Sequence, residues 1–164
     1  MKISILYFSK TGKTREMAEM VAAGARTVPI TDIRLFELDK IDPDYLNESC
    51  AVIFGTPTYY ANTCWQIKKW FDESHAFRLE GKLGAAFATA NYAQGGADVA
   101  LTTLIQHMMV KGMLVYSGGS SLGQPFIHLG AVALKENFDA SREMFRIFGK
   151  RVAEKAKELF DRSI

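Results

Sequence analysis

Small hydroxyl side chains and one glycine follow the first apolar run of the chain, which covers residues 3–8. The segment after this run consists of Ser9, Lys10, Thr11, Gly12, Lys13 and Thr14, and a helical pattern begins directly behind it. Backbone N–H groups and hydroxyls at the start of a helix bind anions, because the helix dipole and the unpaired N–H groups both favour negative charge there. The spacing therefore predicts a phosphate site, to which the two lysines can add Coulomb attraction.

Three kinds of phosphate loop differ in where they place glycine. A Walker A loop requires a glycine five residues before its Gly-Lys pair, and this chain has Tyr7 there. A dinucleotide fingerprint requires three glycines, whereas this segment contains only Gly12. A mononucleotide loop of the form Ser/Thr-x-Thr-Gly-x-Thr matches at each motif position. An ordinary Ser/Thr cap on a helix is the alternative interpretation of the same residues.

Two later segments combine aromatic side chains with small residues and amides. The first consists of Pro57, Thr58, Tyr59, Tyr60, Ala61 and Asn62, and the second contains Thr89, Ala90, Asn91, Tyr92, Gly95 and Gly96. Tyrosine rings can cover the faces of an isoalloxazine ring, and backbone groups can hydrogen-bond its polar edge. Together with the phosphate segment, they predict a flavin site. Two ordinary surface loops with half-buried tyrosines are the alternative.

Strand and helix patterns alternate along the chain. Strands are expected at 3–8, 30–38, 51–55, 83–89 and 113–117, and helices at 14–26, 42–48, 63–74, 98–110 and 141–161. This alternation predicts an α/β fold in which a five-stranded parallel sheet has helices on both faces. Ligands bind such sheets outside the carboxyl ends of the strands, where the strand order reverses. We therefore expect the three candidate segments, which follow strands one, three and four, to converge.

Apolar residues at helical spacing mark the sides of the helices that face the core. In the first helix they are Met17, Ala18, Val21, Ala22 and Ala25, and in the last they are Phe145, Phe148, Val152, Ala156 and Leu159. The segment 118–139 is rich in Gly and Ser and long for a connection, so we expect a lid or an oligomer contact there.

Length and composition limit the class of protein. The chain has 164 residues, of which 48% are hydrophobic, and this suits one globular domain over 1–164. No apolar run is long enough to span a membrane, and Cys50 and Cys64 form no C-x-x-C pair, so a reduced, cytoplasmic setting is expected. A net charge of +2 is too even to indicate a nucleic-acid partner.

With these motifs in place, the chain resembles the flavodoxin-like flavoproteins, and in particular the WrbA-type NAD(P)H:quinone oxidoreductases and related FMN reductases. The resemblance covers most of residues 2–160 and rests on Ser9 to Thr14, on the run Gly-Thr-Pro-Thr-Tyr-Tyr-Ala-Asn from Gly55 to Asn62, and on Thr89 to Gly96. It implies strand order 2-1-3-4-5, non-covalent FMN, NAD(P)H and a quinone as substrates, and a homodimer or homotetramer. The chain departs from that group in being shorter after Ser117 and in having Tyr59 where a basic residue is common.

Two functional interpretations follow from the resemblance. The first is an enzyme in which FMN passes hydride from NAD(P)H to a quinone or similar aromatic acceptor by a ping-pong scheme. The alternative is a flavodoxin-type electron carrier without a substrate site, and the net charge of +2 argues against it because such carriers are usually acidic. A flavin-free signalling domain would need acidic residues where the chain has Ser9-Lys10 and Gly55-Thr56.

No catalytic side chain and no metal site is predicted. The three histidines, His75, His107 and His128, lack any motif context, so we expect structural or surface positions for them. The chemistry of a flavoprotein belongs to the flavin, and the protein supplies orientation and electrostatics.

Overall fold

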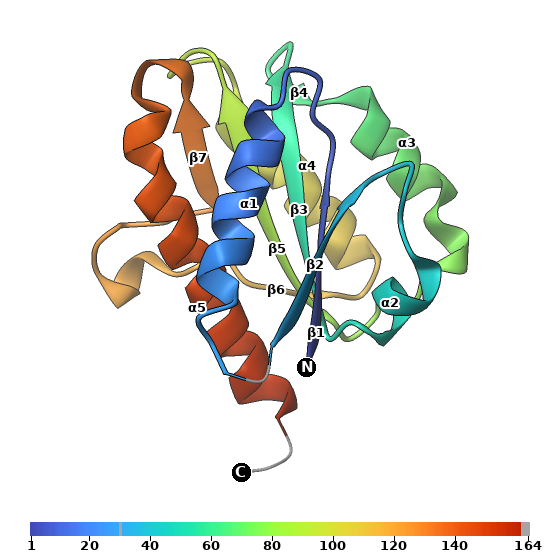
Figure 1. Ribbon diagram of the computed structural model, residues 1–164. Coiled ribbons are helices and arrows are strands. Elements are labelled where there is room, and N and C mark those ends of the chain that lie inside the picture. Colours follow the sequence, from blue (N-terminus) through green and yellow to red (C-terminus); the bar gives the residue numbers. More distant parts are fainter. Residues whose placement is uncertain (30, 162–164) are drawn as a thin grey trace.

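Seven strands and five α-helices make up the computed structural model, which describes residues 1–29 and 31–161. The strands are β1 Lys2–Tyr7, β2 Asp32–Glu37, β3 Ala51–Tyr59, β4 Asn62–Thr63, β5 Leu83–Ala90, β6 Leu114–Val115 and β7 Ala131–Leu134. The helices are α1 Lys13–Ala25, α2 Pro43–Glu48, α3 Trp65–Glu73, α4 Ala97–Val110 and α5 Arg142–Phe160. Figure 1 shows the sheet between a layer formed by α1 and α5 and a layer formed by α3 and α4. The fold is the predicted flavodoxin-like α/β architecture.

The main sheet runs in the order β2-β1-β3-β5-β6, and each neighbouring pair is parallel. The strands expected first to fifth are β1, β2, β3, β5 and β6, so the expected order 2-1-3-4-5 is confirmed. The strand order reverses between β1 and β3, and the carboxyl ends of these two strands therefore flank the crevice in which such sheets bind ligands. The expected strand at 30–38 includes Ile30, which lies outside the described residues.

The fifth strand position is shared by two short strands. β6 pairs with Leu83 and Gly84 at the start of β5, whereas β7 pairs with Phe87 to Ala90 at its end. Residues 116–130 interrupt the strand between them. The segment expected to be irregular thus contains β7, and Gly130 makes its approach possible, because a Cβ there would lie 2.1 Å from the carbonyl oxygen of Ala86.

The interrupting residues are fixed by one buried guanidinium. Arg151 on α5 donates hydrogen bonds of 3.0–3.3 Å to the carbonyls of Gly118, Gly119, Gly123, Gln124 and Pro125. Nη1 donates to three of these carbonyls and Nη2 to the other two, so the backbone surrounds the positive charge with hydrogen-bond acceptors. These hydrogen bonds connect residues 118–125 to α5.

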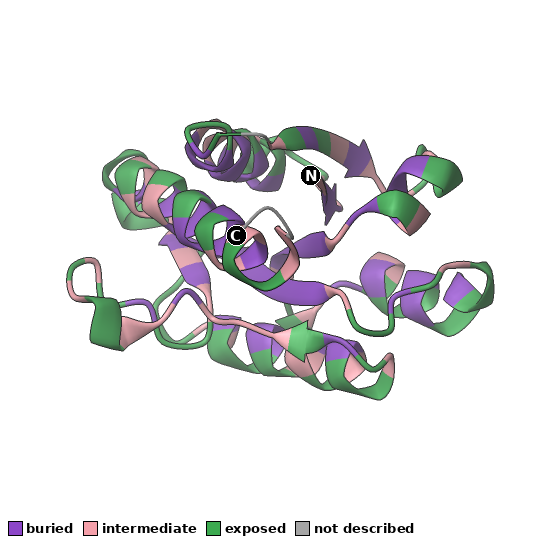
Figure 2. Ribbon diagram, turned by 90° about the horizontal axis from the view of Figure 1, so that it is seen from below, coloured by how far each residue is buried: buried purple, intermediate pink, exposed green. Residues whose placement is uncertain are grey.

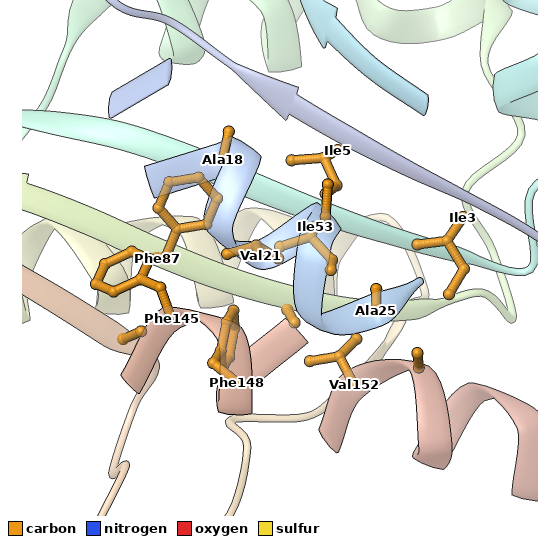
Figure 3. Packing of buried hydrophobic residues seen from close by; sticks show 14 of the residues in the cluster. Ile3, Ile5, Ala18, Val21, Ala25, Ile53, Phe87, Phe145, Phe148 and Val152 are labelled. Atoms are coloured by element: carbon orange, nitrogen blue, oxygen red, sulfur yellow. The ribbon is translucent and has the colours of Figure 1, made fainter. Parts of the chain in front are cut away.

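Hydrophobic side chains form one core on each face of the sheet. Figure 3 shows Val21 of α1, Phe87 of β5 and Phe145 and Phe148 of α5 in the first core, and Figure 2 shows buried residues along the sheet-facing sides of the helices. The predicted stripe of α1 is buried throughout. The prediction for α5 is confirmed except at Leu159, which is 47% exposed. No helix among the described residues combines the length and hydrophobicity needed to cross a membrane.

Candidate functional site

The turn between β1 and α1 carries exposed backbone amides. Gly12 precedes the helix with φ of 89°, a conformation that favours glycine, and its carbonyl accepts the Glu16 N–H at 2.9 Å. The Ser9 hydroxyl accepts the Arg15 N–H at 3.2 Å. Because Gly12 has no side chain that could cap the helix, the N–H groups of Lys13 and Thr14 at the first turn are available to an external acceptor.

Two threonine hydroxyls join this turn to the end of β5. Thr14 Oγ1 and Thr89 Oγ1 lie 2.9 Å apart, and both residues are buried. Each hydroxyl carries one proton, and the bond within the pair uses one of them. The other proton remains for an acceptor beside the pair.

The third strand ends in a hairpin rather than in the loop that the sequence predicted. β3 continues to Tyr59 and pairs with β4, and Tyr60 and Ala61 form the two-residue turn with φ of 47° and 60°. Positive φ at both central positions is typical of a type I′ hairpin turn, and it is strained for residues other than Gly and Asn. Pro57 therefore lies inside β3, not in a turn, and it causes no loss of pairing because β1 has already ended beside it.

The strained hairpin is held against α4. Asn62 Oδ1 accepts hydrogen bonds of 2.7 Å from the Thr63 N–H and from the Thr103 hydroxyl of α4. Gly96, directly before α4, approaches so closely that a Cβ would lie 2.4 Å from Ala61 Cα. These contacts fix the tip of the hairpin beside the loop that follows β5.

Two adjoining cavities lie between the three predicted segments. The larger, about 520 Å³, is lined by Lys10, Thr11, Lys13, Thr14, Pro57, Thr58, Tyr59, Thr89, Ala90, Asn91, Lys135, Phe138 and Asp139. The smaller, about 300 Å³, is lined by Thr58, Tyr59, Tyr60, Ala61, Ala90, Asn91, Tyr92 and Gly95. Four residues line both cavities, so the phosphate segment and the tyrosine-bearing segments do converge as expected. Combined volumes of this size suit a cofactor.

Four predicted site residues do not line these cavities. Ser9 and Gly12 shape the start of α1, and Asn62 and Gly96 connect the hairpin to α4. Three lining residues were missed: Lys135, Phe138 and Asp139 follow β7, so recognising the strand in the run Ala131–Leu134 would have placed them at the site.

One buried polar atom in the cavities has no hydrogen-bond partner. Thr58 Oγ1 is among the two side-chain atoms of this kind in the described part of the chain, the other being Gln66 Oε1. An unpaired buried hydroxyl is unfavourable by about 1–3 kcal/mol, so Thr58 Oγ1 would be stabilised by a hydrogen-bond partner from a ligand or a water molecule.

The charges at the larger cavity are predominantly positive. Lys10, Lys13 and Lys135 line it, and Lys13 Nζ lies 4.3 Å from the centre of the Phe138 ring. Arg142 donates a hydrogen bond of 2.9 Å to Glu16, which lowers the pKa of that carboxyl and joins the first turns of α1 and α5. This end of the site is therefore suited to an anion.

Tyr59 and the nearby Cys64 thiol are held in their neutral forms. Burial raises the pKa of Tyr59 and of the Cys64 thiol, which keeps both neutral at physiological pH. His107 Nδ1 is 2.6 Å from the carbonyl oxygen of Thr103 and its ring packs on Phe71, whereas His75 and His128 are exposed, and none of the three lines either cavity. Within residues 1–29 and 31–161, no group of three or more His, Cys, Asp or Glu side chains could hold a metal ion.

Comparison with known proteins gives consistent matches across the chain. The sequence model of the flavodoxin family matches residues 5–112. A protein of Clostridium saccharobutylicum named flavodoxin is 54% identical over 160 residues, which are 98% of this chain and 100% of the relative. A protein of Aromatoleum aromaticum named NAD(P)H dehydrogenase (quinone) is 29% identical, with 97% of each chain covered. Among solved structures, a flavodoxin described as WrbA-like from Agrobacterium tumefaciens superimposes with a TM-score of 0.80 at 28% identity, covering 96% of this chain and 98% of that one.

Proposed function

Because the chain belongs to the flavodoxin family, we propose that it binds FMN without a covalent bond and carries electrons between redox enzymes. The observation that supports this proposal best is the 54% identity to a protein named flavodoxin over 98% of this chain and all of the relative. The larger cavity adds hydroxyl and lysine side chains that can bind a phosphate. FMN would supply the redox chemistry when bound. The residues of the chain would bind it, orient it and limit its contact with water.

The residues present fit the two ends of FMN. The phosphate monoester would be held by the open amides of Lys13 and Thr14, by the Thr14–Thr89 pair and by the lysines of the larger cavity. Charge-assisted hydrogen bonds of this type are about twice as strong as neutral ones. The unpaired Thr58 hydroxyl would find its partner on the polar part of the cofactor.

The arrangement of tyrosines favours a carrier over an enzyme that receives hydride. Tyr59 and Tyr92 come from neighbouring loops and both line the smaller cavity, where they would offer their rings to the faces of a flat cofactor. A hydride donor must stack on one of these faces, whereas electron transfer requires only an exposed edge. A carrier therefore needs no catalytic side chain.

The NAD(P)H:quinone oxidoreductase interpretation has a weaker basis. It rests on the relative that is 29% identical and on the WrbA-like structural neighbour. Under this interpretation NAD(P)H and a quinone would be the substrates, and the protein would form a homodimer or homotetramer. The subunits of such an oligomer would bury apolar side chains that are exposed here, such as Trp65 and Met109, which are 66% and 63% exposed.

Stopped-flow mixing separates the two functions. The FMN-loaded protein is mixed anaerobically with NADH or NADPH, with and without a flavoprotein reductase that oxidises NADPH and reduces flavodoxins. For a carrier, the flavin absorbance stays constant for minutes with nicotinamide alone and bleaches when the reductase is added. Bleaching within seconds by NADH or NADPH alone would instead support the oxidoreductase.

A further inference from the structure

A third cavity lies on the other side of the β1 carboxyl end from the lysine-lined cavity. It has a volume of about 460 Å³ and is bounded by the chain after β1, the chain after β2 and one side of α3, which lie together in Figure 1. Its lining residues are Tyr7, Phe8, Ser9, Glu37, Leu38, Asp39, Trp65, Gln66, Lys69, Trp70 and Glu73. Cavities of this volume accept small organic ligands.

Both tryptophans of the chain form walls of this cavity. Trp65 is largely exposed, whereas Trp70 is buried and stacks on Phe77 with ring centres 5.5 Å apart. The stacked pair gives a rigid apolar floor, and a neighbouring hollow of about 270 Å³ continues along Trp70. The faces of tryptophan rings attract cations, since they carry negative partial charge.

The second unpaired buried atom of the described chain belongs to this cavity. Gln66 lines it, and Gln66 Oε1 is buried without a hydrogen-bond partner, as Thr58 Oγ1 is in the proposed FMN site. An amide oxygen can only accept hydrogen bonds. The partner that this oxygen lacks is therefore an N–H or O–H donor.

The charged side chains around the cavity are mainly carboxylates. Glu37, Asp39 and Glu73 line it, against a single ammonium group from Lys69. Glu37 is paired with Arg15 and Lys40, and Glu73 lies near Lys69, with 3.9 Å between Nζ and Oε1 of the Lys69–Glu73 pair. Asp39 makes no ion pair within the described residues, so its charge remains available to an occupant.

We propose that this cavity binds a small planar organic cation that carries N–H donors, such as an amidinium, a guanidinium or a protonated aromatic amine. The exposed Trp65 ring would take its flat body beside the buried Trp70, Gln66 would accept one N–H, and Asp39 would offset the positive charge. This site shares only Ser9 with the predicted cofactor residues and does not depend on the protein binding FMN.

Indole N–H resonances of the FMN-loaded protein provide the test, because the two tryptophans of the chain both line the cavity. The ¹⁵N-labelled protein is titrated with benzamidine, with benzamide as the neutral isostere and benzoate as the anion. We expect benzamidine to shift both indole cross-peaks to saturation with an affinity about tenfold above that of benzamide. Benzoate should give no saturable shift.

Variants test the named contacts. Gln66→Leu should weaken benzamidine about tenfold and Asp39→Asn severalfold, whereas Gln106→Leu on the exposed side of α4 should leave binding unchanged. The flavin absorbance, recorded in each titration, should remain constant. The proposal is overturned if benzamidine gives no saturable shift, if benzoate binds as well, or if both cavity variants bind it like the wild type. Loss of bound FMN during the titration would also overturn it.

Discussion

At the scale of single residues, hydroxyl groups decide what the candidate site can hold. The sequence predicted Thr14, Thr58 and Thr89 as site residues, and all three line the larger cavity. Their roles could not be read from the motif, because the Thr14–Thr89 bond joins residues 75 positions apart. The motif identifies a local segment, whereas the state of each hydroxyl depends on which strand ends beside it.

The unpaired hydroxyl of Thr58 leads to a prediction with opposite effects on stability and binding. In Thr58→Val the apoprotein should become more stable by about 1 kcal/mol, because the buried polar atom without a partner is removed. FMN affinity should fall about tenfold, since the cofactor loses a hydrogen bond. Urea unfolding of the apoprotein and FMN titration measure the two effects. An apoprotein that is destabilised, or an unchanged FMN affinity, would contradict the assigned role.

At the scale of elements, strand and helix order could be predicted because hydrophobic periodicity is local. The hairpin β3–β4 and the strand β7 could not, for different physical reasons. The hairpin turn uses Tyr60 and Ala61 at positive φ, where Asn and Gly are the usual signal, so tertiary contacts to α4 override local preference. β7 has only four residues and pairs with β5 about forty positions away, which no local pattern reveals.

Substitution of Gly96 should reduce the stability of the fold more than substitution of Gly81, although both glycines have positive φ. Gly96 has φ of 91° and abuts Ala61, whereas Gly81 has φ of 74° with no atom within 4 Å of a built Cβ. Gly81→Ala should reduce the free energy of unfolding by about 1 kcal/mol from backbone strain alone. Gly96→Ala should reduce it by about 2–4 kcal/mol, because the clash adds to the strain, and it should also weaken FMN.

Urea unfolding of the two glycine variants measures this difference. If both variants lose the same stability, the clash at Gly96 has little effect. The close contact between Gly96 and Ala61 would then not hold the hairpin against α4.

Helix α2 and strand β2 are joined by Tyr45, and this contact has a pH dependence. The Tyr45 hydroxyl donates a 2.7 Å hydrogen bond to the Asp32 carbonyl, and burial, as the largest cause, raises the pKa of Tyr45 to about 12 from 10.0. The folded state therefore prefers the protonated phenol. The resulting stability is fully present below pH 10 and is lost as the pH rises towards 12.

Comparison with Tyr45→Phe isolates this titration. Between pH 10 and pH 12, the free energy of unfolding of the wild type should fall by about 2 kcal/mol more than that of the variant. Urea unfolding at several pH values measures both curves. Parallel curves over this range would show that Tyr45 titrates equally in the folded and unfolded chains.

At the scale of the whole molecule, the net charge and the similarity to known proteins favour different functions. The net charge of +2 argued against a carrier, yet the full-length relative with 54% identity is a flavodoxin. Three lysines of the chain line the larger cavity, and a bound phosphate monoester contributes about −1.5 to −2 charges. Part of the positive charge of the apoprotein would therefore be neutralised by the cofactor phosphate. The net charge of the FMN-loaded protein, which a redox partner meets, would be closer to zero.

The most direct test of the proposed cofactor site compares FMN with riboflavin, which lacks the phosphate. Quenching of flavin fluorescence on titration with the apoprotein gives both affinities, for the wild type, Thr14→Val and the helix control Thr102→Val. The wild type and Thr102→Val should bind FMN at least about a hundredfold more tightly than riboflavin, and Thr14→Val should reduce that ratio about tenfold by weakening FMN alone. Equal affinities for FMN and riboflavin, or no binding of either, would contradict the account.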